Sequence, residues 1–500
     1  MRQRAFFPTL VLALTLLWAF GPTFIITCAA GVPLSTTNTE WGTATTTSSE
    51  CPIWEEQPGG DDKEEDDSSS FVDVAIIGAG PAGLATAIGL LRRLDDNVKI
   101  RIYERATELR SSSQGMLSLF PNGMTSLGKI HTDLPRLVTN AGCPFETKIL
   151  VTIDKDGGIT ERIDQPSKPE PGTILIRWHA LQMVLAGLVP DGILTTGHSL
   201  GTFKETSDYV LLRFDNGKTV RAGIVIGADG TFSSVRRRMF PTDRPVYFGQ
   251  MNWNAIIQTS SLPLDSRPPA KGIKIVNYDG EPARWSAYIN DCGGGHTFFQ
   301  LRVADVEKAR ALSGSNGRGG LGLAGTKAAL LPVVKRSADV TNILHAVPEE
   351  TMFERVIVGR LPALTWCSPG GRVALLGDAA HGMHPSMGQG CNSALGSAVA
   401  LTESLAAQFH TRGDDRDSNW AVKGLTEYES IRLPRMDWLH RIANMLGCGQ
   451  ASGEEWLDRE TMRSWFTWPQ HADSSIPPPT EGRDTVKAFN PLSCPGVSIL

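Results

Sequence analysis

Three short motifs of glycine and aspartate stand in a fixed order along the chain. They are Gly78-Ala79-Gly80-Pro81-Ala82-Gly83, then Gly227-Ala228-Asp229-Gly230, and finally Gly377-Asp378 with Gly388-Gln389-Gly390 downstream. Glycines at such spacings allow tight turns and a close approach of the backbone to a phosphate, and a nearby carboxylate can bind sugar hydroxyls. The chemistry that these residue types predict is the binding of a dinucleotide.

The first motif lies between a predicted strand and a predicted helix. Residues 71–77 form a short apolar run, and the helical stretch covers about 82–94. A second strand, 98–103, is followed by Glu104, which can accept hydrogen bonds from a ribose 2′-hydroxyl and disfavours a 2′-phosphate. The N–H groups at the helix start suit a pyrophosphate. This opening predicts a parallel sheet that binds FAD or NAD rather than NADP.

The third motif favours FAD over NAD. Asp378 follows a predicted buried strand, 372–376, and its carboxylate can accept hydrogen bonds from the hydroxyls of a ribitol chain. Gly388-Gln389-Gly390 opens a helix of small residues, and the N-terminus of such a helix stabilises negative charge. A reduced flavin carries negative charge near N1, whereas nicotinamide has no counterpart.

The pattern of predicted strands changes between residues 243 and 353. Short aromatic-rich strands separated by turn signals indicate an antiparallel sheet. We therefore expect an α/β fold, with a Rossmann-like FAD-binding domain of the glutathione reductase type made of residues 71–242 and 354–446. The sheet would be an inserted substrate-binding lobe, and residues 447–500 an irregular tail. Candidates for substrate contact, although such residues are more often simple core, are Trp253, Trp285, Tyr288, Phe298 and Phe299.

The composition is that of a globular chain without a nucleic-acid site. Its 500 residues carry a net charge of −5, and the triplet Arg236-Arg237-Arg238 is more typical of a helix face or an anion contact than of a basic patch. The eight cysteines show no zinc-like spacing, so we interpret them as mostly buried or free thiols and predict no metal site. His381 and His384 lie between the two parts of the third motif, as hydrogen-bond donors or structural residues, and no catalytic residue is assigned.

The N-terminus indicates targeting. Arg2 and Arg4 precede an uncharged, largely apolar run, and residues 1–31 together are typical of a cleaved secretory signal or, alternatively, a membrane anchor. The address would be the endomembrane system or an organelle reached through it. Residues 32–70 are rich in Ser and Thr and then strongly acidic, which predicts a disordered linker.

The three motifs together resemble the single-component FAD-dependent monooxygenases of the p-hydroxybenzoate hydroxylase type. That group includes salicylate-type hydroxylases, kynurenine 3-monooxygenase and zeaxanthin epoxidase. The resemblance covers about residues 72–439 and includes the segment Leu119–Gly123 and Ile176-Arg177 with Leu181 and Leu185. Two segments depart from the pattern, because Ser112–Gly115 lacks an arginine and Gly396-Ser397 lacks an acidic residue that relatives often carry.

The resemblance implies a role for each residue of this chain that matches one of the family's motifs. Glu104 would bind the adenosine ribose, and Arg105 would lie beside the adenine half. Arg177 and Asp229 would approach the pyrophosphate, and Asp378 would hold the ribitol. The other cofactor-binding residues, which act largely through their backbone, would be Gly78, Gly80, Ala82, Gly83, Pro385, Gly388, Gly390 and Asn392.

The activity implied by the resemblance is monooxygenation. NADH or NADPH would reduce FAD, O₂ would form a flavin C4a-hydroperoxide, and an aromatic or isoprenoid small molecule would be hydroxylated or epoxidised. Two alternatives stay open, namely an FAD-dependent reductase of prenyl double bonds and a non-catalytic FAD-binding protein. The sequence sets neither the substrate nor the oligomeric state.

Overall fold

The computed structural model describes residues 71–109, 115–166, 172–278, 280–303, 311–312, 320–412, 419–448, 464, 477–481, 483–494 and 498–499. The predicted signal and linker, residues 1–70, lie outside these ranges, as do residues 112–114 of the first departing segment. Among the described residues, no helix combines the length and apolar character needed to cross a bilayer.

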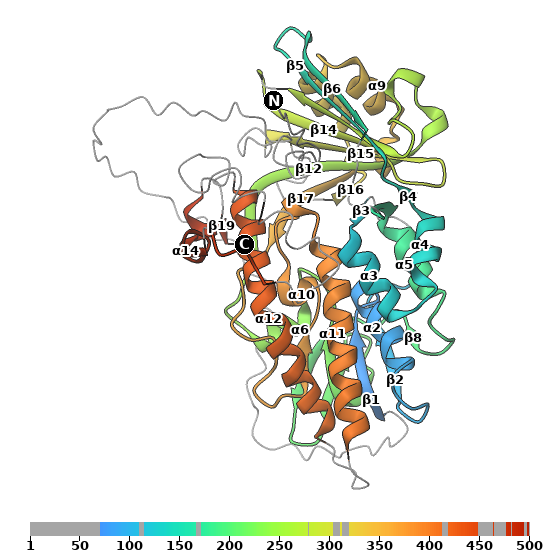
Figure 1. Ribbon diagram of the computed structural model, residues 1–500, viewed down its shortest axis with the longest axis vertical. Helices are drawn as coiled ribbons and strands as arrows, with labels where there is room; N and C mark the ends of the chain where they lie inside the picture. The colour runs from blue at the N-terminus through green and yellow to red at the C-terminus, as the bar shows by residue number, and fades with distance from the viewer. Residues whose placement is uncertain are drawn as a thin grey trace, which may run out of the picture.

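A seven-stranded sheet forms the lower part of the molecule in Figure 1. Its central strand β1 (Phe71–Ile77) pairs in parallel with β2 (Ile100–Tyr103) and with β11 (Thr219–Gly227). Consecutive buried residues in β1 and β11 are typical of parallel strands covered on both faces. The other strands are β8 (Leu194–Thr195), β9 (Leu200–Glu205), β10 (Val210–Phe214) and β18 (Val373–Leu375).

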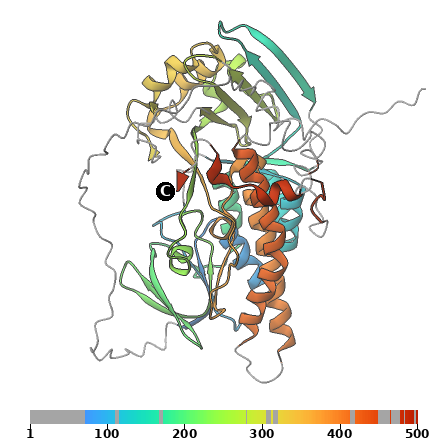
Figure 2. The same cartoon turned by 90° about the vertical axis from the view of Figure 1, so that its left-hand side faces the viewer.

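Helices and a small sheet pack around this lower part. Helix α2 (Pro81–Leu91) contacts α11 (Gly390–Thr411), and α11 runs beside α12 (Trp420–Gly447), as Figures 1 and 2 show. A three-stranded sheet of β3 (Met116–Leu119), β4 (Cys143–Pro144) and β7 (Ile174–Arg177) lies where the lower part meets the upper one. Nearby helices are α3 (Pro121–Ile130), α4 (Leu134–Ala141) and α5 (Trp178–Ala186).

A nine-stranded, mostly antiparallel sheet forms the upper part. Its strands are β5 (Thr147–Ile153), β6 (Ile159–Pro166), β12 (Val246–Gln258), β13 (Gly272–Tyr278), β14 (Trp285–Asp291), β15 (His296–Val303), β16 (Gly320–Leu321), β17 (Phe353–Gly359) and β19 (Ser498–Ile499). Strand β5 joins β13 in parallel and β6 in antiparallel pairing. The expected lobe boundary of 243–353 therefore omits β5 and β6, which join this sheet because β5 pairs with the remote β13.

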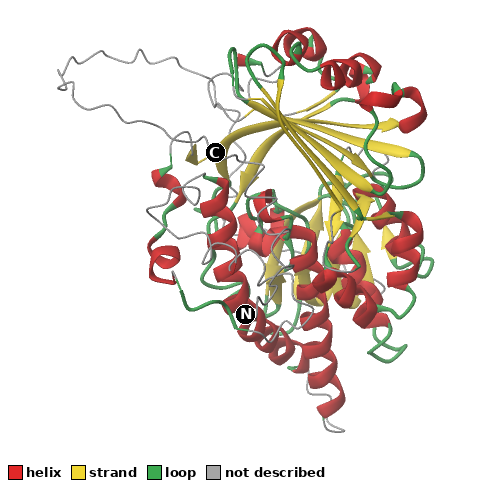
Figure 3. Cartoon of the chain, turned by 45° about the horizontal axis from the view of Figure 1, so that its top comes forward, coloured by secondary structure: helices red, strands yellow, loops and turns green. Residues whose placement is uncertain are grey.

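The two faces of the upper sheet differ. One face packs on α8 (Thr326–Val334) and α9 (Ala338–Ala346), which lie above the strands in Figure 3. Trp253, Trp285 and Phe299 belong to that core, and the indole N–H of Trp285 donates to the Val333 carbonyl oxygen at 3.1 Å. These three candidates for substrate contact are therefore core residues.

The described part of the C-terminal tail is partly regular. Helix α14 (Arg483–Ala488) contacts α12, and a short 3₁₀ turn, η9 (Pro491–Ser493), precedes Cys494. Strand β19 then pairs with the start of β12. Cys143, Cys292, Cys367, Cys391, Cys448 and Cys494 are free thiols, as predicted for most cysteines.

Candidate functional site: a dinucleotide crevice

The glycine loop joins β1 to α2 and leaves no room for a side chain at Gly78 or Gly83. Gly78 has a φ of 107°, and a Cβ there would lie 2.6 Å from the carbonyl oxygen of Ala228 in the second motif. A Cβ on Gly83 would collide with the Gly78 carbonyl oxygen. Because no side chain caps the N-terminus of α2, its first N–H groups remain available to an anion.

Glu104 follows β2 and braces this loop. Its Oε2 accepts a hydrogen bond from the Ala79 N–H at 2.8 Å, and its Oε1 accepts one from the Ala106 N–H at 3.0 Å. Gln182 of α5, which the sequence analysis missed, donates from Nε2 to the Ala79 carbonyl oxygen at 2.8 Å. The neighbouring Arg105 is exposed. The Glu104 carboxylate thus lies beside the loop, with lone pairs left for a hydroxyl.

Asp229 caps a helix. Its carboxylate accepts hydrogen bonds from the Ser233 hydroxyl and from the Ser234 and Val235 N–H groups, at 2.5, 2.6 and 3.2 Å. These bonds hold the start of α6 (Ser234–Met239), and burial raises the pKa of Asp229 despite them. A role near a pyrophosphate remains a prediction, because three donors already use this carboxylate.

Asp378 opens α10 (Asp378–His381) where the three motifs meet. One carboxylate oxygen accepts a hydrogen bond from the Thr231 hydroxyl at 3.3 Å, and desolvation raises the pKa of the group. A Cβ on the preceding Gly377 would lie 3.1 Å from the Ala82 Cβ and 3.4 Å from the Ala394 Cβ. The starts of α2, α10 and α11 therefore converge on one place.

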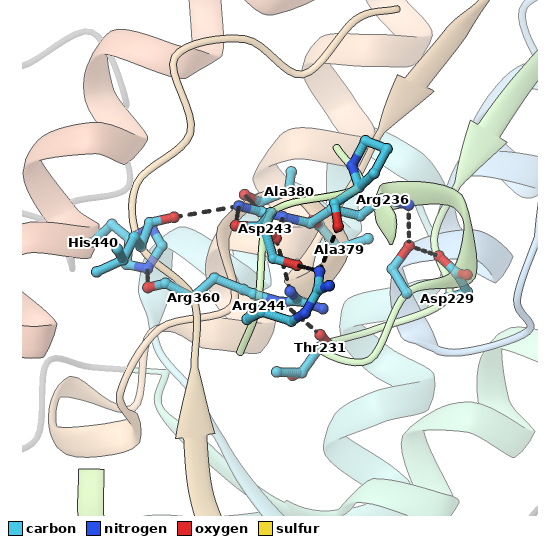
Figure 4. A network of polar contacts seen from close by, with 12 residues as sticks. Asp229, Thr231, Arg236, Asp243, Arg244, Arg360, Ala379, Ala380 and His440 are labelled. Atoms are coloured by element: carbon cyan, nitrogen blue, oxygen red, sulfur yellow. Dashed lines mark hydrogen bonds and ion pairs between the residues drawn. The ribbon is translucent and has the colours of Figure 1, made fainter. Parts of the chain in front are cut away.

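An ion-pair network holds the second and third motifs together (Figure 4). The Oδ2 atom of Asp243 accepts hydrogen bonds from Arg236 Nε and from Arg360 Nη1, both at 2.7 Å. Arg236 also donates to the carbonyl oxygens of Ala379 and Ala380, at 3.0 and 2.8 Å. The first arginine of the basic triplet is therefore a buried brace of α10, whereas Arg237 and Arg238 are exposed.

A third set of contacts shapes the start of α11. The Asn392 amide oxygen accepts from the Phe120 N–H at 3.0 Å, and its NH₂ group donates to the carbonyl oxygens of Ser118 and Gly388 at 2.9 Å. Gly388 has a φ of 62°, and like Pro385 it is exposed. Pro385 and Gly388 flank the N-terminus of α11 at Gly390, where no side chain provides a cap. This helix end is open toward solvent.

The two histidines are buried and neutral. The Nδ1 atom of His384 accepts from the Ser386 N–H at 3.1 Å, and its Nε2 contacts the Gln250 amide oxygen at 3.3 Å. The Nε2 atom of His381 contacts the Ser397 hydroxyl at 3.1 Å. Desolvation lowers both pKa values well below 6.5, which suits structural bracing rather than proton transfer at neutral pH.

Arg177 and other unpaired groups fit a bound dinucleotide. Among the described residues, the buried Arg177 Nε, Gln182 Oε1 and Gln389 Nε2 have no hydrogen-bond partner. Arg177 ends β7, and a Cβ on Gly294 would lie 3.6 Å from its Nη2, so it faces the turn between β14 and β15. Buried polar atoms are rarely left unpaired. With the uncapped ends of α2 and α11, they offer polar partners to a ligand of mixed phosphate and polar character. These helix ends follow the carboxyl ends of β1 and β18, where parallel sheets bind ligands in a crevice, and we use that name for this region.

Comparisons with known proteins point to the same ligand. Residues 366–440 match a family model described as an FAD binding domain. The zeaxanthin epoxidase of Spinacia oleracea is 25% identical over 389 residues, which cover 74% of this chain and 53% of the relative. The chain thus spans about half the length of that relative. A 3-amino-4-hydroxybenzoate 2-monooxygenase of Streptomyces cremeus is 30% identical over 380 residues, covering 75% of this chain and 86% of the relative.

The fold is shared with solved structures. Klebsiella pneumoniae HpxO complexed with FAD and uric acid superimposes with a TM-score of 0.59 at 22% identity, covering 80% of this chain and 92% of that one. This likeness concerns the fold, whereas the identity to the Streptomyces relative extends over most of both sequences. The chain belongs to the FAD-dependent monooxygenases of the p-hydroxybenzoate hydroxylase type.

Proposed function

We propose that this protein is a monooxygenase that uses FAD, NADH or NADPH, and O₂ to hydroxylate or epoxidise an aromatic or lipophilic small molecule. The observation that carries the proposal is the convergence of two uncapped helix ends, those of α2 and α11, beside Asp378. One end suits a pyrophosphate, and the other suits the negative charge of a reduced ring. The names of the relatives, an epoxidase and an aminohydroxybenzoate monooxygenase, support this activity over a reductase or a non-catalytic role.

The residues around the crevice would bind and orient the cofactor. When bound, FAD supplies hydride acceptance and oxygen activation. The glycine loop and α2 would hold the pyrophosphate, with Glu104 toward the adenosine ribose and Arg105 near the adenine half. Arg177, with its unpaired Nε, would approach the pyrophosphate from β7. Asp229 would act there indirectly, by holding the start of α6.

The other end of the crevice would receive the flavin ring. Asp378 would bind ribitol hydroxyls with the lone pairs that Thr231 leaves unused. Backbone of Pro385, Gly388 and Gly390 would frame the ring, and Asn392 would fix the spacing of this wall against the 118–120 segment. The upper sheet would cover the ring and restrict water, a function that monooxygenation requires.

The activity can be tested with the full chain reconstituted with FAD. Oxygen uptake and flavin absorbance would be followed with NADH or NADPH across phenols, aromatic acids and carotenoids, and products would be analysed after reaction under isotopically heavy O₂. We expect one candidate to stimulate oxygen uptake and to gain a single heavy oxygen atom. A product that gains hydrogen without oxygen would favour a reductase, and failure to retain FAD would overturn both enzyme assignments.

We propose in addition that residues 1–31 direct the protein to a membrane-bounded compartment. The support is the apolar N-terminal run and the description of the Spinacia oleracea relative as chloroplastic. Fluorescent fusions of the full chain and of a chain lacking residues 1–31 would test this address. A diffuse signal from both fusions would contradict it, and carbonate extraction would separate an anchored form from a cleaved one.

A further inference from the structure

The described C-terminal segment, residues 483–494 and 498–499, returns to the end of helix α12 (Figure 1). Its helix α14 contacts α12, where the Lys487 carbonyl oxygen accepts a hydrogen bond from Arg441 Nη1 at 3.4 Å. The Lys487 amine also lies 5.6 Å from the ring centroid of Trp438. The residues of the segment that are buried in the core of the lower part are Val486, Phe489 and Cys494. The segment is therefore fixed along the last turns of α12.

Beyond α14 the chain comes close to the residue that follows α12. The turn η9 leads into Cys494, which is 4% exposed, and β19 then pairs with the start of β12 through Ile499 and Val246. Cys448, the residue after α12, packs against the small apolar cluster that contains Val246. Contacts on both sides of Cys494 thus bring this part of the chain to Cys448.

The side chains of Cys448 and Cys494 share a hydrogen bond. Both residues are free thiols in the structure, and both belong to the core of the lower part, where Cys494 is buried and Cys448 is partly buried. A disulfide joins two sulfur atoms about 2.05 Å apart and two Cβ atoms about 3.8 Å apart. Thiols in hydrogen-bond contact lie on neighbouring segments, so a small rotation of the side chains can bring the sulfur atoms to this distance.

The same hydrogen bond makes one of the two thiols reactive. With Cys448 as the donor, it lowers the pKa of the Cys494 thiol and raises the pKa of the Cys448 thiol. The thiolate is the form of cysteine that attacks oxidants, and a lowered pKa increases its share at neutral pH. Cys494 therefore supplies the nucleophile, and Cys448 is the neighbouring thiol that can complete a disulfide.

A second pair of cysteines, in the upper part, lacks this arrangement. Cys143 of β4 and Cys292, which follows β14, are both buried. The Cys143 thiol donates to the Pro144 carbonyl oxygen at 3.5 Å, and the Cys292 thiol donates to the His296 carbonyl oxygen at 3.3 Å. Burial raises the pKa of both thiols to about 12. These neutral thiols are directed at carbonyl oxygens, and they provide a comparison within the same chain.

We propose that Cys448 and Cys494 are a redox-active pair whose disulfide fastens the C-terminal segment to the end of α12. The oxidant is a small hydroperoxide such as H₂O₂. The Cys494 thiolate attacks one oxygen of H₂O₂, which forms a sulfenic acid and releases hydroxide. The Cys448 sulfur then attacks the Cys494 sulfur, and the sulfenic oxygen leaves with the Cys448 proton as water. Two thiols lose two electrons and two protons, and one H₂O₂ becomes two molecules of water.

Peptide mapping of the FAD-loaded full chain tests the pair. The protein is reduced, freed of reductant and exposed to a small excess of H₂O₂. It is then quenched in acid, alkylated with N-ethylmaleimide in denaturant and digested without reductant. We expect the peptides that contain Cys448 and Cys494 to be joined in most molecules. Absence of this linked peptide, or a link between Cys143 and Cys292 in at least equal amount, would overturn the proposal.

Thermal unfolding of variants tests the fastening. In the unsubstituted protein, H₂O₂ should raise the melting temperature by about 5 °C, reversibly with dithiothreitol, because a cross-link over a long loop restricts the unfolded chain. Cys448→Ser and Cys494→Ser should both lack this shift. Cys367→Ser is the matched control and should keep it, because the Cys367 thiol donates to the Leu425 carbonyl oxygen.

Each variant is compared with itself before and after oxidation, so a general loss of stability does not obscure the result. A reversible shift that persists in Cys448→Ser, or no shift in the unsubstituted protein, would overturn the fastening. Neither measurement involves turnover. The pair can therefore be confirmed where no oxygen is transferred to a product, and it can fail while the monooxygenase assignment stands.

Discussion

The crevice and the sheet above it present polar groups by different means. The crevice uses backbone: uncapped helix ends at α2 and α11, and glycines that hold the chain close. The sheet presents side chains, such as the hydrogen-bonded Asn252 of β12 and Arg302 of β15, on the face opposite α8 and α9. The difference teaches that a site made of backbone can be recognised from glycine spacing, whereas a site made of side chains depends on register.

The largest expected effect comes from the ion pairs that hold the crevice. Asp243→Asn leaves the buried guanidiniums of Arg236 and Arg360 without their shared carboxylate, and it should lower the free energy of unfolding by about 3–5 kcal/mol. The matched change in the upper part is Asp339→Asn, which breaks a single contact with Lys274 at 2.6 Å. We expect that change to cost about 1 kcal/mol in urea unfolding. Equal losses of unfolding free energy would mean that the network stabilises the fold no more than the single Lys274–Asp339 pair does.

The next largest expected difference between the two regions is the effect of a glycine substitution on FAD affinity. Gly78→Ala places a Cβ 2.6 Å from a backbone oxygen, at a φ that costs a side chain about 1–2 kcal/mol, so FAD affinity should fall by about tenfold or more. Gly295→Ala, in the turn of the upper sheet, also has a positive φ but meets nothing within 4 Å. It should retain FAD, measured by the flavin absorbance of purified protein. Comparable losses in both would contradict a backbone-built crevice.

Asp378→Ala should reduce FAD retention by about tenfold, because the half-buried hydrogen-bond acceptor proposed for the ribitol is lost. Glu104→Gln should act more weakly, since the amide still carries an oxygen for the Ala79 N–H. Equilibrium dialysis of each variant apoprotein against FAD gives the dissociation constants of FAD for both variants. An unchanged constant in Asp378→Ala would show that the ribitol assignment is wrong.

The smallest effects concern pH. In both regions stability should fall as the pH drops, but over different pH ranges. In the lower part, burial lowers the pKa of His440 to about 4, below the unfolded value of 6.5. The unfolded chain therefore binds more protons, and stability should fall below about pH 6.5 by up to 1.36 kcal/mol per unit for such a group. His440→Gln should flatten this acid slope, while the raised pKa of Asp378 offsets part of it.

In the upper sheet the corresponding group is Lys148, whose pKa burial lowers from 10.5 to about 7. Its unfolded form binds a proton below 10.5, so its contribution to stability should fall as the pH drops from 10.5 to 7. Lys148→Met should flatten the alkaline slope and leave the acid slope unchanged. Urea unfolding at stepped pH values measures the acid slope and the alkaline slope of stability. If either substitution changed both slopes equally, the assignment of one slope to each region would be wrong.

The predicted elements succeeded where local signals were strong. The βαβ opening and the helix after Gly390 follow from short-range patterns, and the family likeness confirmed the FAD fold. The place of β5 and β6 in the upper sheet was missed because β13, the partner of β5, is remote in sequence. The contact of Gln182 with Ala79 gave no signal either, because it depends on how α5 packs.

The polar face of the sheet could not be predicted for a related reason. Aromatic residues stood out in the composition of these strands, yet Trp253 and Trp285 point away from the crevice. Side chains alternate between the two faces of each strand. The position of α8 and α9 decides which face is buried, and the sequence of a single strand does not show that position. That Asn252, Arg302 and Arg355 share one face became evident only from the pairing of β12 with β15 and β17.

The path of the chain between the two sheets has a consequence for biogenesis. Strand β5 comes early in the chain, but it can pair with β13 only after β13 has been synthesised. In the lower sheet, β11 likewise pairs with β18, which comes late in the chain. Contacts of such long sequence separation slow folding and keep partly built edges exposed. Neither sheet can be completed during synthesis until its late strand emerges, so we expect the nascent protein to depend on chaperones, and an excised half to aggregate rather than fold.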